Sequence, residues 1–352
     1  MKDHIVAAFP PNKIYTRHSE GAFLRLKDGR ILFVYSRFRE NSSDDAPSDL
    51  VASFSADEGE SWSEPVEIIS AQRDYGVRNI MSVSLMRMQN GDVGLFYIVK
   101  ATPSRNRIML SRSNDEGKTF YRHTDCVPPE RQSYYVLNND RVIRLKSGRL
   151  VMPLAYHRGG YDQDAKPFFD GSATACFLLS DDDGETWRES RDTVFPPFHT
   201  TRSGLQEPGV VELNSGVVWA YFRTDQFRHY EAFSMNGGET WTKAQPSRFS
   251  GPNSPITIQR IDGAFYAVWN PVPVYNGRAR GEHASYGGRT PLVMAVSPDG
   301  FSWPEIPSLV GNDPHCAYCY PSLFKTADGC MLVAYLACHD NGDHLYIRKI
   351  PL

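Results

Sequence analysis

The chain repeats a short turn that ends in glycine and leads into an apolar, aromatic-rich run. The six turns end at Gly29, Gly91, Gly148, Gly216, Gly263 and Gly329, so the mean period is 60 residues. This period matches one four-stranded sheet per repeat, and aromatic and β-branched residues after each turn are typical of strands. The repeat therefore predicts an all-β fold, a six-bladed β-propeller with one blade for each turn.

A second repeat, out of phase with the first, has the pattern S-x-D-x-G-x-T-W. It occurs at residues 55–62, 113–120, 180–187 and 234–241, with small substitutions, and in a copy one residue shorter at residues 297–303. An Asp or Asn in such a turn accepts hydrogen bonds from backbone N–H groups, and the glycine supplies a positive φ. These segments resemble Asp-boxes, the hairpin motif of sialidase-type propellers. The resemblance implies that Asp57, Asp115 and Asp182 stabilise the outer rim and take no part in catalysis.

Composition limits the possible partners. The 352 residues form one continuous repeat, which predicts a single domain over residues 1–352 with the N- and C-terminal strands closing the ring. The net charge of −3 gives no basic surface for nucleic acid or an anionic membrane. The first residues lack the apolar core of a signal peptide, and no run approaches the roughly 20 apolar residues of a membrane span. We expect a cytoplasmic protein with neither nucleic acid nor membrane as partner.

The six cysteines are expected to be free thiols, because a chain of this length can bury a core without disulfides. His315, Cys316 and Cys319 resemble half of a zinc site, but no second pair with ligand spacing follows except Cys338 and His339. We interpret the cysteines as small buried side chains and predict no metal.

Polar residues flank the expected inner strands at similar distances from the glycine turns. They occur at residues 17–20, 78–79, 138–141, 206–208, 289 and 318–321. Inner strands of a propeller converge at one end of the central channel, so these side chains are predicted to share one cleft.

Two of these segments resemble the sialidase (neuraminidase) superfamily. Residues 206–216 and the following Arg223 are similar to the family segment with the activating Glu and the second arginine, which implies those roles for Glu207 and Arg223. The segment that starts at Tyr320 and ends in the turn at Gly329 is similar to the family's nucleophile segment. It implies that Tyr320 is the nucleophile, with Tyr318 as a rival.

The same resemblance implies the remaining site residues. Arg289 matches the third of the arginines that bind the sugar carboxylate, and Asp44 or Asp45 matches the acid/base, with a slight preference for Asp45. The family's Arg-Ile-Pro tripeptide is replaced by residues 17–19, Arg-His-Ser. The first arginine is therefore absent, displaced to Arg17, or replaced in space by Arg78.

The implied chemistry is retaining cleavage of a terminal acidic sugar by a glycoside hydrolase that resembles exo-α-sialidases. A neutral Tyr avoids the repulsion between a carboxylate nucleophile and the sugar carboxylate, and Glu207 would take its proton. Tyr-nucleophile sialidases are an exception to the usual pair of catalytic carboxylates, and no cofactor is needed. Two alternatives stay open: a hydrolase or lyase on a uronic-acid glycan with His18 or His157 as acid/base, and a non-catalytic carbohydrate-binding propeller.

Overall fold

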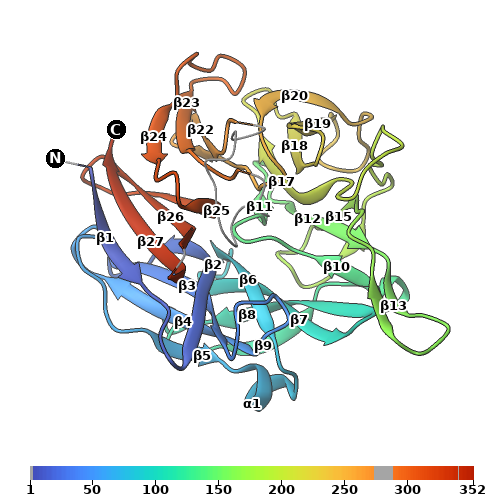
Figure 1. Cartoon of the computed structure of the whole chain (residues 1–352), viewed down its shortest axis with the longest axis horizontal. Coiled ribbons are helices and arrows are strands. Elements are labelled where there is room, and N and C mark those ends of the chain that lie inside the picture. Colours follow the sequence, from blue (N-terminus) through green and yellow to red (C-terminus); the bar gives the residue numbers. More distant parts are fainter. Residues whose placement is uncertain (1–2, 273–287, 340) are drawn as a thin grey trace.

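The computed structural model describes residues 3–272, 288–339 and 341–352, and in it β-sheets surround a central axis (Figure 1). Three sheets have four consecutive antiparallel strands. They contain β6 (Ile80–Arg87), β7 (Val93–Thr102), β8 (Arg105–Ser113) and β9 (Tyr121–Asp125); β17 (Gln206–Glu212), β18 (Val218–Arg223), β19 (Arg228–Ser234) and β20 (Gln245–Ser250); and β21 (Thr257–Ile261), β22 (Ala264–Trp269), β23 (Leu292–Ser297) and β24 (Ser308–Gly311).

The other sheets are less regular. A five-stranded sheet contains β10 (Tyr134–Val136), β11 (Ile143–Arg144), β12 (Leu150–His157), β15 (Thr174–Ser180) and β16 (Arg188–Glu189). Between its strands β12 and β15 the chain forms a separate hairpin of β13 (Gly159–Tyr161) and β14 (Pro167–Phe169). An eight-stranded sheet contains β1 (His4–Phe9), β2 (Tyr15–Arg25), β3 (Ile31–Arg39), β4 (Ser48–Ser55), β5 (Val66–Ile69), β25 (Ala317–Lys325), β26 (Cys330–His339) and β27 (Gly342–Pro351). Two short helices, α1 (Ala71–Tyr75) and the 3₁₀ helix η1 (Pro129–Arg131), complete the described elements.

The all-β prediction is confirmed, but the prediction of a six-bladed propeller is wrong. Among the described residues, four sheets of four or five strands have the size of one blade, and the strands of the first and last repeats belong to a single eight-stranded sheet. Its two halves meet where Arg17 of β2 pairs in parallel with Asp343 of β27, and β1 adds to β27 along the outer edge. The number of glycine turns gives the number of repeats, but it does not reveal that strands from the two ends of the chain pair with each other.

The Asp-boxes stabilise hairpins as their sequence predicts. In the first box, Asp57 Oδ1 accepts a hydrogen bond from the Ser61 N–H at 2.9 Å, and Ser55 Oγ accepts one from the Gly59 N–H at 2.8 Å. Gly59 has φ of +86°, and the Trp62 Nε1–H donates to the Gly59 carbonyl at 3.1 Å. Side-chain acceptors thus replace backbone partners inside a turn that only glycine adopts without strain.

In the first three boxes, the acidic residue before the box glycine connects the box to the neighbouring repeat. Glu58 Oε2 accepts from the Ala327 N–H at 2.7 Å, and Glu116 Oε2 accepts from the Lys27 N–H at 2.8 Å. Asp183 Oδ2 accepts from the Gln89 N–H at 2.9 Å. These carboxylates hold the glycine turns in a ring, while apolar clusters such as Phe96, Leu110, Leu150 and Leu178 fill the space between adjacent sheets.

The innermost strands share a β-bulge near their start. In β2, β6, β17 and β25 two residues oppose one residue of the partner strand, and the first residue of each bulge has a positive φ. These residues are Glu20 (58°), Ser82 (59°), Glu207 (46°) and Tyr320 (54°). Bulges redirect side chains, so four strands from three sheets contribute a polar side chain at the same level of the axis. No helix in the described ranges is long and apolar enough to span a membrane.

Candidate functional site

A cavity of about 580 Å³ lies at one end of the axis, where the bulged strands converge. Most of the predicted site residues line it, namely Tyr320, Glu207, Asp44, Asp45, Arg17, Arg223 and Arg289. The bulge residues Glu20 and Ser82 line it as well. The structure therefore brings together residues from both ends and the middle of the chain.

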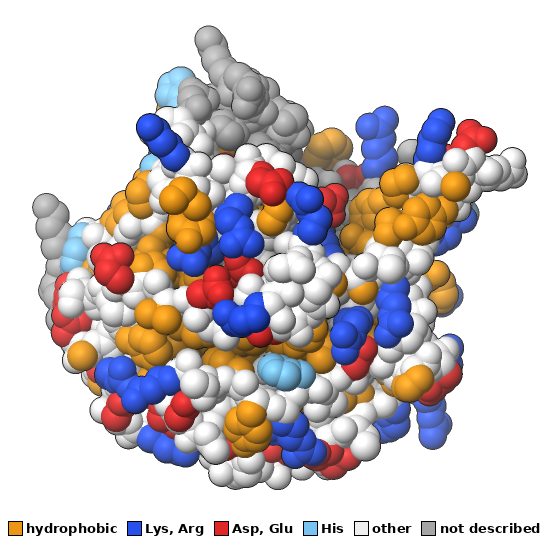
Figure 2. Space-filling view, turned by 90° about the horizontal axis from the view of Figure 1, so that it is seen from below, with side chains coloured by type: hydrophobic (Ala, Val, Ile, Leu, Met, Phe, Trp, Pro, Cys, Tyr) orange, Lys and Arg blue, Asp and Glu red, His pale blue; other side chains and the backbone are white. Residues whose placement is uncertain are grey.

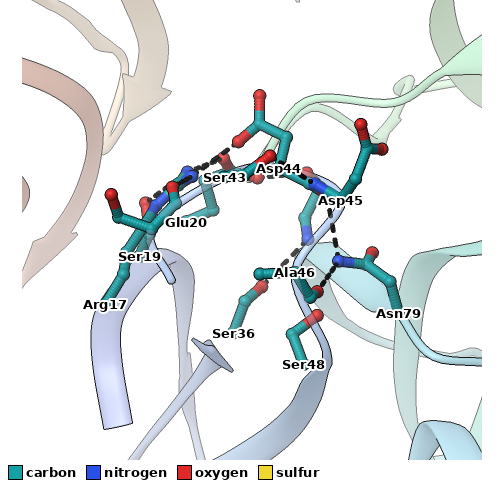
Figure 3. A network of polar contacts seen from close by, with 12 residues as sticks. Arg17, Ser19, Glu20, Ser36, Ser43, Asp44, Asp45, Ala46, Ser48 and Asn79 are labelled. Carbon is teal, nitrogen blue, oxygen red and sulfur yellow. Dashed lines mark hydrogen bonds and ion pairs between the residues drawn. The ribbon is translucent and has the colours of Figure 1, made fainter. Parts of the chain in front are cut away.

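Arg17 supplies a guanidinium group at the wall formed by β2. Its Nη1–H donates to Asp44 Oδ1 at 2.5 Å and to the Ser42 carbonyl at 3.1 Å, and its Nη2–H donates to Glu20 Oε1 at 2.9 Å (Figure 3). The side chain is 6% exposed. Of the two arginines that the sequence offers for the first position, Arg17 lines the cavity and Arg78 does not.

Glu20 is the buried partner that holds Arg17 in place. Its second oxygen, Oε2, accepts a hydrogen bond from the Ser82 hydroxyl of the neighbouring bulge. Burial raises the pKa of Glu20 from 4.5 to about 7, against the opposing effect of the Arg17 charge. A carboxyl group beside an arginine normally favours its charged form. Here the cost of removing the charge from water outweighs the attraction of Arg17, so the neutral form is favoured.

The loop between β3 and β4 presents the two candidate acid/base residues. Asp44 turns toward Arg17, whereas Asp45 turns away and pairs with Lys100 Nζ at 3.0 Å (Figure 3). The Asn79 amide fixes this loop by donating to the carbonyls of Asp44 at 3.0 Å and Ala46 at 2.6 Å. Partial loss of hydration favours protonation of Asp44, although its side chain is 58% exposed, but the charges of Arg17 and Lys100 hold its pKa below the ordinary value.

The second and third arginines share one asparagine. Arg223 Nε–H donates to Asn253 Oδ1 at 2.6 Å, and Arg289 donates to the Asn253 carbonyl from Nη2 at 3.1 Å. Arg223 Nη1–H also donates to Glu207 Oε1 at 2.6 Å, and both of these side chains are 11% exposed. The other oxygen, Glu207 Oε2, is buried without a hydrogen-bond partner among the described residues. An unpaired buried carboxylate oxygen is costly unless a ligand or a neighbouring hydroxyl uses it.

Tyr320 lies beside this carboxylate. Burial raises the pKa of its phenol well above 10, and the charges of Glu207, Asp44 and Glu20 raise it further. The group is therefore a neutral phenol at all ordinary pH values. Tyr318, its rival in the sequence, is 6% exposed, accepts a hydrogen bond from the Asp313 N–H at 3.0 Å and packs on Tyr335 outside the lining of the cavity.

Two predicted substrate-binding residues lie outside the lining. Arg78 is exposed and pairs with Glu40 at 2.8 Å. His18 is buried among the rings of Phe9, Tyr15 and Tyr35, and burial lowers its pKa to about 4. His157 does line the cavity, and its Nδ1 is 3.0 Å from the Asp170 carbonyl, so that nitrogen carries the proton.

Sequence reasoning assigned no role to Glu20 and did not select Ser82, Asn253 or Asp343. One signal would have found the bulge residues: Glu20, Ser82, Glu207 and Tyr320 each lie nine positions before a repeat glycine, at 29, 91, 216 and 329. Asn253 lies in a loop with no such spacing. Asp343 lines the cavity because of the parallel pairing with Arg17.

All six cysteines are free and buried. Cys319 and Cys338 lie in the wall of the cavity and share a hydrogen bond. Within the described part of the chain, no group of three or more His, Cys, Asp or Glu side chains is arranged to hold a metal ion.

Comparisons with known proteins place the chain in a family. The model of the BNR repeat-like domain matches residues 36–333. Anhydrosialidase of Macrobdella decora is 26% identical over 255 residues, which are 68% of this chain and 31% of that protein. Sialidase B of Streptococcus pneumoniae serotype 4 is 28% identical over 152 residues, which are 41% of this chain and 19% of that protein. The chain thus spans less than a third of the length of these curated relatives.

A solved structure agrees with the fold. The intramolecular trans-sialidase of Ruminococcus gnavus superimposes with a TM-score of 0.68 at 15% identity, covering 97% of each chain. At that identity the likeness concerns the fold alone. The family model covers most of the chain, and its relatives are sialidases: the chain belongs to the BNR repeat-like domain family and is a sialidase-like BNR repeat protein.

Proposed function

We propose that the protein is a glycoside hydrolase of the sialidase type that releases a terminal sugar bearing a carboxylate, with net retention of configuration. One observation carries the proposal. The guanidinium groups of Arg17, Arg223 and Arg289 line the same cavity as Tyr320 and the unpaired Oε2 of Glu207. Planar guanidinium groups suit bidentate carboxylate binding, and a phenol paired with a carboxylate base suits attack at a carbon that already bears a carboxylate.

In the first step Tyr320 attacks the anomeric carbon. Its hydroxyl oxygen forms the new C–O bond, and the phenolic proton passes to Glu207 as the bond forms. The raised pKa of Tyr320 makes this coupling necessary, because a free phenolate is not populated beforehand. Arg223 holds the other oxygen of Glu207, which leaves Oε2 as the acceptor of the proton.

Asp44 is the acid that the geometry favours over Asp45. Its carboxylate is bound to Arg17, whereas Asp45 is paired with Lys100 and its side chain is 84% exposed. A substrate carboxylate on Arg17 would compete with Asp44 for the same guanidinium. Release of Asp44 from Arg17 removes the charge that holds its pKa down, so substrate binding itself favours protonation of the acid.

The remaining transfers follow from these assignments. Asp44 gives its proton to the leaving-group oxygen as the old C–O bond breaks. In the second step a water molecule attacks the anomeric carbon, Asp44 takes a proton from it, and the bond to Tyr320 breaks. The phenolate then recovers its proton from Glu207. Two displacements at one carbon give net retention.

The test is hydrolysis of a fluorogenic α-sialoside, with an aryl glucuronide measured alongside. Wild type should cleave the sialoside, Tyr320→Phe should lose the activity, and Tyr318→Phe should keep it, because Tyr318 is outside the lining of the cavity. Proton NMR of the first product should show the anomer of the starting linkage.

Three results would contradict the proposal in different ways. Cleavage of the glucuronide alone would favour a uronic-acid hydrolase, with His157 as the histidine to mutate because it lines the cavity and His18 does not. Binding of a sialoside without turnover would favour a carbohydrate-binding protein. Full activity in Tyr320→Phe would refute the nucleophile.

A further inference from the structure

The β13–β14 hairpin projects from the molecule and carries aromatic side chains in the open. Tyr161, Phe168 and Phe169 are 57%, 41% and 54% exposed. In the space-filling view hydrophobic side chains cover a projecting lobe (Figure 2). Phe169 is the one of the three that lines the cavity. An exposed aromatic side chain at the edge of a polar cavity indicates a contact with a ligand.

The ring of Phe169 is held in place by two other rings. Its centroid lies 4.7 Å from that of His157 and 5.2 Å from that of Tyr134, and both of these residues line the cavity. Gly159 is opposite Phe169 in the hairpin, and a Cβ there would lie 2.6 Å from the Pro103 carbonyl oxygen and 3.3 Å from the Tyr134 ring. The glycine therefore lets the hairpin rest against Tyr134.

Hydrogen bonds fix the base of the β13–β14 hairpin to strands β12 and β17, which form part of the wall of the cavity. His157 Nδ1 donates to the Asp170 carbonyl at 3.0 Å, and Gln206 Nε2 donates to the Gly171 carbonyl at 2.8 Å. Gln206 precedes Glu207 in β17. The position of Phe169 relative to the proposed base is thus set before a ligand binds, which lowers the entropy lost on binding.

The direction of the leaving group follows from in-line displacement. The base Glu207 and Arg223 are 11% exposed and lie deep in the cavity, whereas the side chain of Asp44 is 58% exposed. Tyr320 attacks from the side of Glu207, so the leaving oxygen points the opposite way, toward Asp44 and solvent. Phe169 lines the same cavity and is 54% exposed, so its ring is available to a leaving group that points toward solvent.

We propose that Phe169, supported by Tyr134 and His157, is the platform on which the sugar on the leaving-group side stacks, and that this sugar is a neutral pyranose. The inference rests on the proposed function. One face of a pyranose presents C–H groups, which pack on an aromatic ring. Among the described residues no Lys or Arg side chain lies over the Phe169 ring. Arg158 pairs with Asp170, and Lys100 of the lining is bound to the Asp44 carbonyl and Asp45.

The test compares two substrates that differ only beyond the scissile bond, 3′-sialyllactose and methyl α-sialoside. In Phe169→Ala we expect kcat/KM for sialyllactose to fall about tenfold, which is the effect of about 1.4 kcal/mol of lost stacking. The value for the methyl sialoside should stay within twofold of wild type. Phe168→Ala is the matched control, since it removes the neighbouring exposed ring, which is outside the lining.

Equal losses on both substrates in Phe169→Ala, or the same loss in Phe168→Ala, would overturn the platform. Wild type that cleaves neither substrate would refute the proposed function, and saturation-transfer NMR with lactose then tests the platform by itself. A lactose signal lost in Phe169→Ala and kept in Phe168→Ala would support it. Equal signals in the two variants, or no signal in wild type, would overturn it.

Discussion

Replacing Glu20 by Gln should stabilise the protein in a pH-dependent manner. Gln has the same shape, its oxygen can still accept the hydrogen bond from Arg17 and its NH2 group can donate to the Ser82 hydroxyl oxygen, but it carries no charge. Burial raises the pKa of Glu20 from 4.5, its value in an unfolded chain, to about 7. The folded state therefore binds this proton more tightly than the unfolded state, and stability falls as pH rises from 4.5 to 7.

The magnitude follows from the two pKa values. A tenfold change in proton affinity is worth about 1.4 kcal/mol, so a pKa moved from 4.5 to about 7 corresponds to about 3 kcal/mol. Near pH 4.5 wild type and Glu20→Gln carry the same neutral group at this site and should differ little. Above pH 7 the variant should exceed wild type by about 3 kcal/mol in free energy of unfolding.

Urea denaturation at intervals between pH 4.5 and 8.5 measures this difference. Glu40→Gln is the matched control, because the side chain of Glu40 is 59% exposed and pairs with Arg78 at the surface. We expect the gap between Glu40→Gln and wild type to stay within 0.5 kcal/mol over the whole range, as for most surface substitutions. A pH-independent gap for Glu20→Gln would refute the reasoning from burial.

Three further predictions concern the acid, the Asp-box and the thiols. Asp44→Asn should lower kcat for sialyllactose by about 100-fold or more and kcat for an aryl sialoside by much less, since a good leaving group needs no acid; steady-state kinetics on both substrates measures this. Asp57→Ala removes the acceptor of the Ser61 N–H and hydroxyl bonds and should lower the free energy of unfolding by about 1–2 kcal/mol with kcat unchanged, as measured in urea. Burial raises the thiol pKa of Cys319, but Cys338 and Arg289 outweigh this effect and hold the pKa below its ordinary value. Because a thiol with a lower pKa reacts faster with alkylating agents, iodoacetamide should inactivate wild type faster than Cys319→Ser at pH 7. Equal rates of inactivation would contradict this prediction.

Sequence reasoning located the part of the site that local geometry determines. Glu207 and Arg223 lie at the open end of one hairpin, where Gln206 pairs with Arg223, so their separation in sequence fixes their separation in space. Tyr320 follows the same rule, because it lies nine residues before a repeat glycine, at the start of a hairpin. These contacts join residues that are close in the sequence, so they can be predicted from one sequence alone.

The remaining features depend on contacts between distant segments. Asp44 and Asp45 are neighbours in a polar loop, and their orientations are set by Arg17 and Lys100 from other strands. The eight-stranded sheet arises from the pairing of Arg17 with Asp343, which no repeat count contains. The replacement of Arg-Ile-Pro by residues 17–19 suggested a gap in the arginine set, but the side chain of Arg17 itself lines the cavity.

The bulges connect stability and function in this protein. A non-glycine residue with positive φ costs of order 1–3 kcal/mol, and the four bulge residues all line the cavity. Three of them, Glu20, Glu207 and Tyr320, are also titratable groups in or beside the proposed chemistry. A residue in a regular part of the strand would have all its backbone hydrogen bonds and would pack against the next sheet. Its side chain would not point at a ligand on the axis, as those of the bulge residues do. The fold therefore accepts backbone strain and a buried acid at the positions where side chains from separate sheets have to meet, and the energy that offsets this cost comes from the Asp-boxes and the apolar clusters between adjacent sheets.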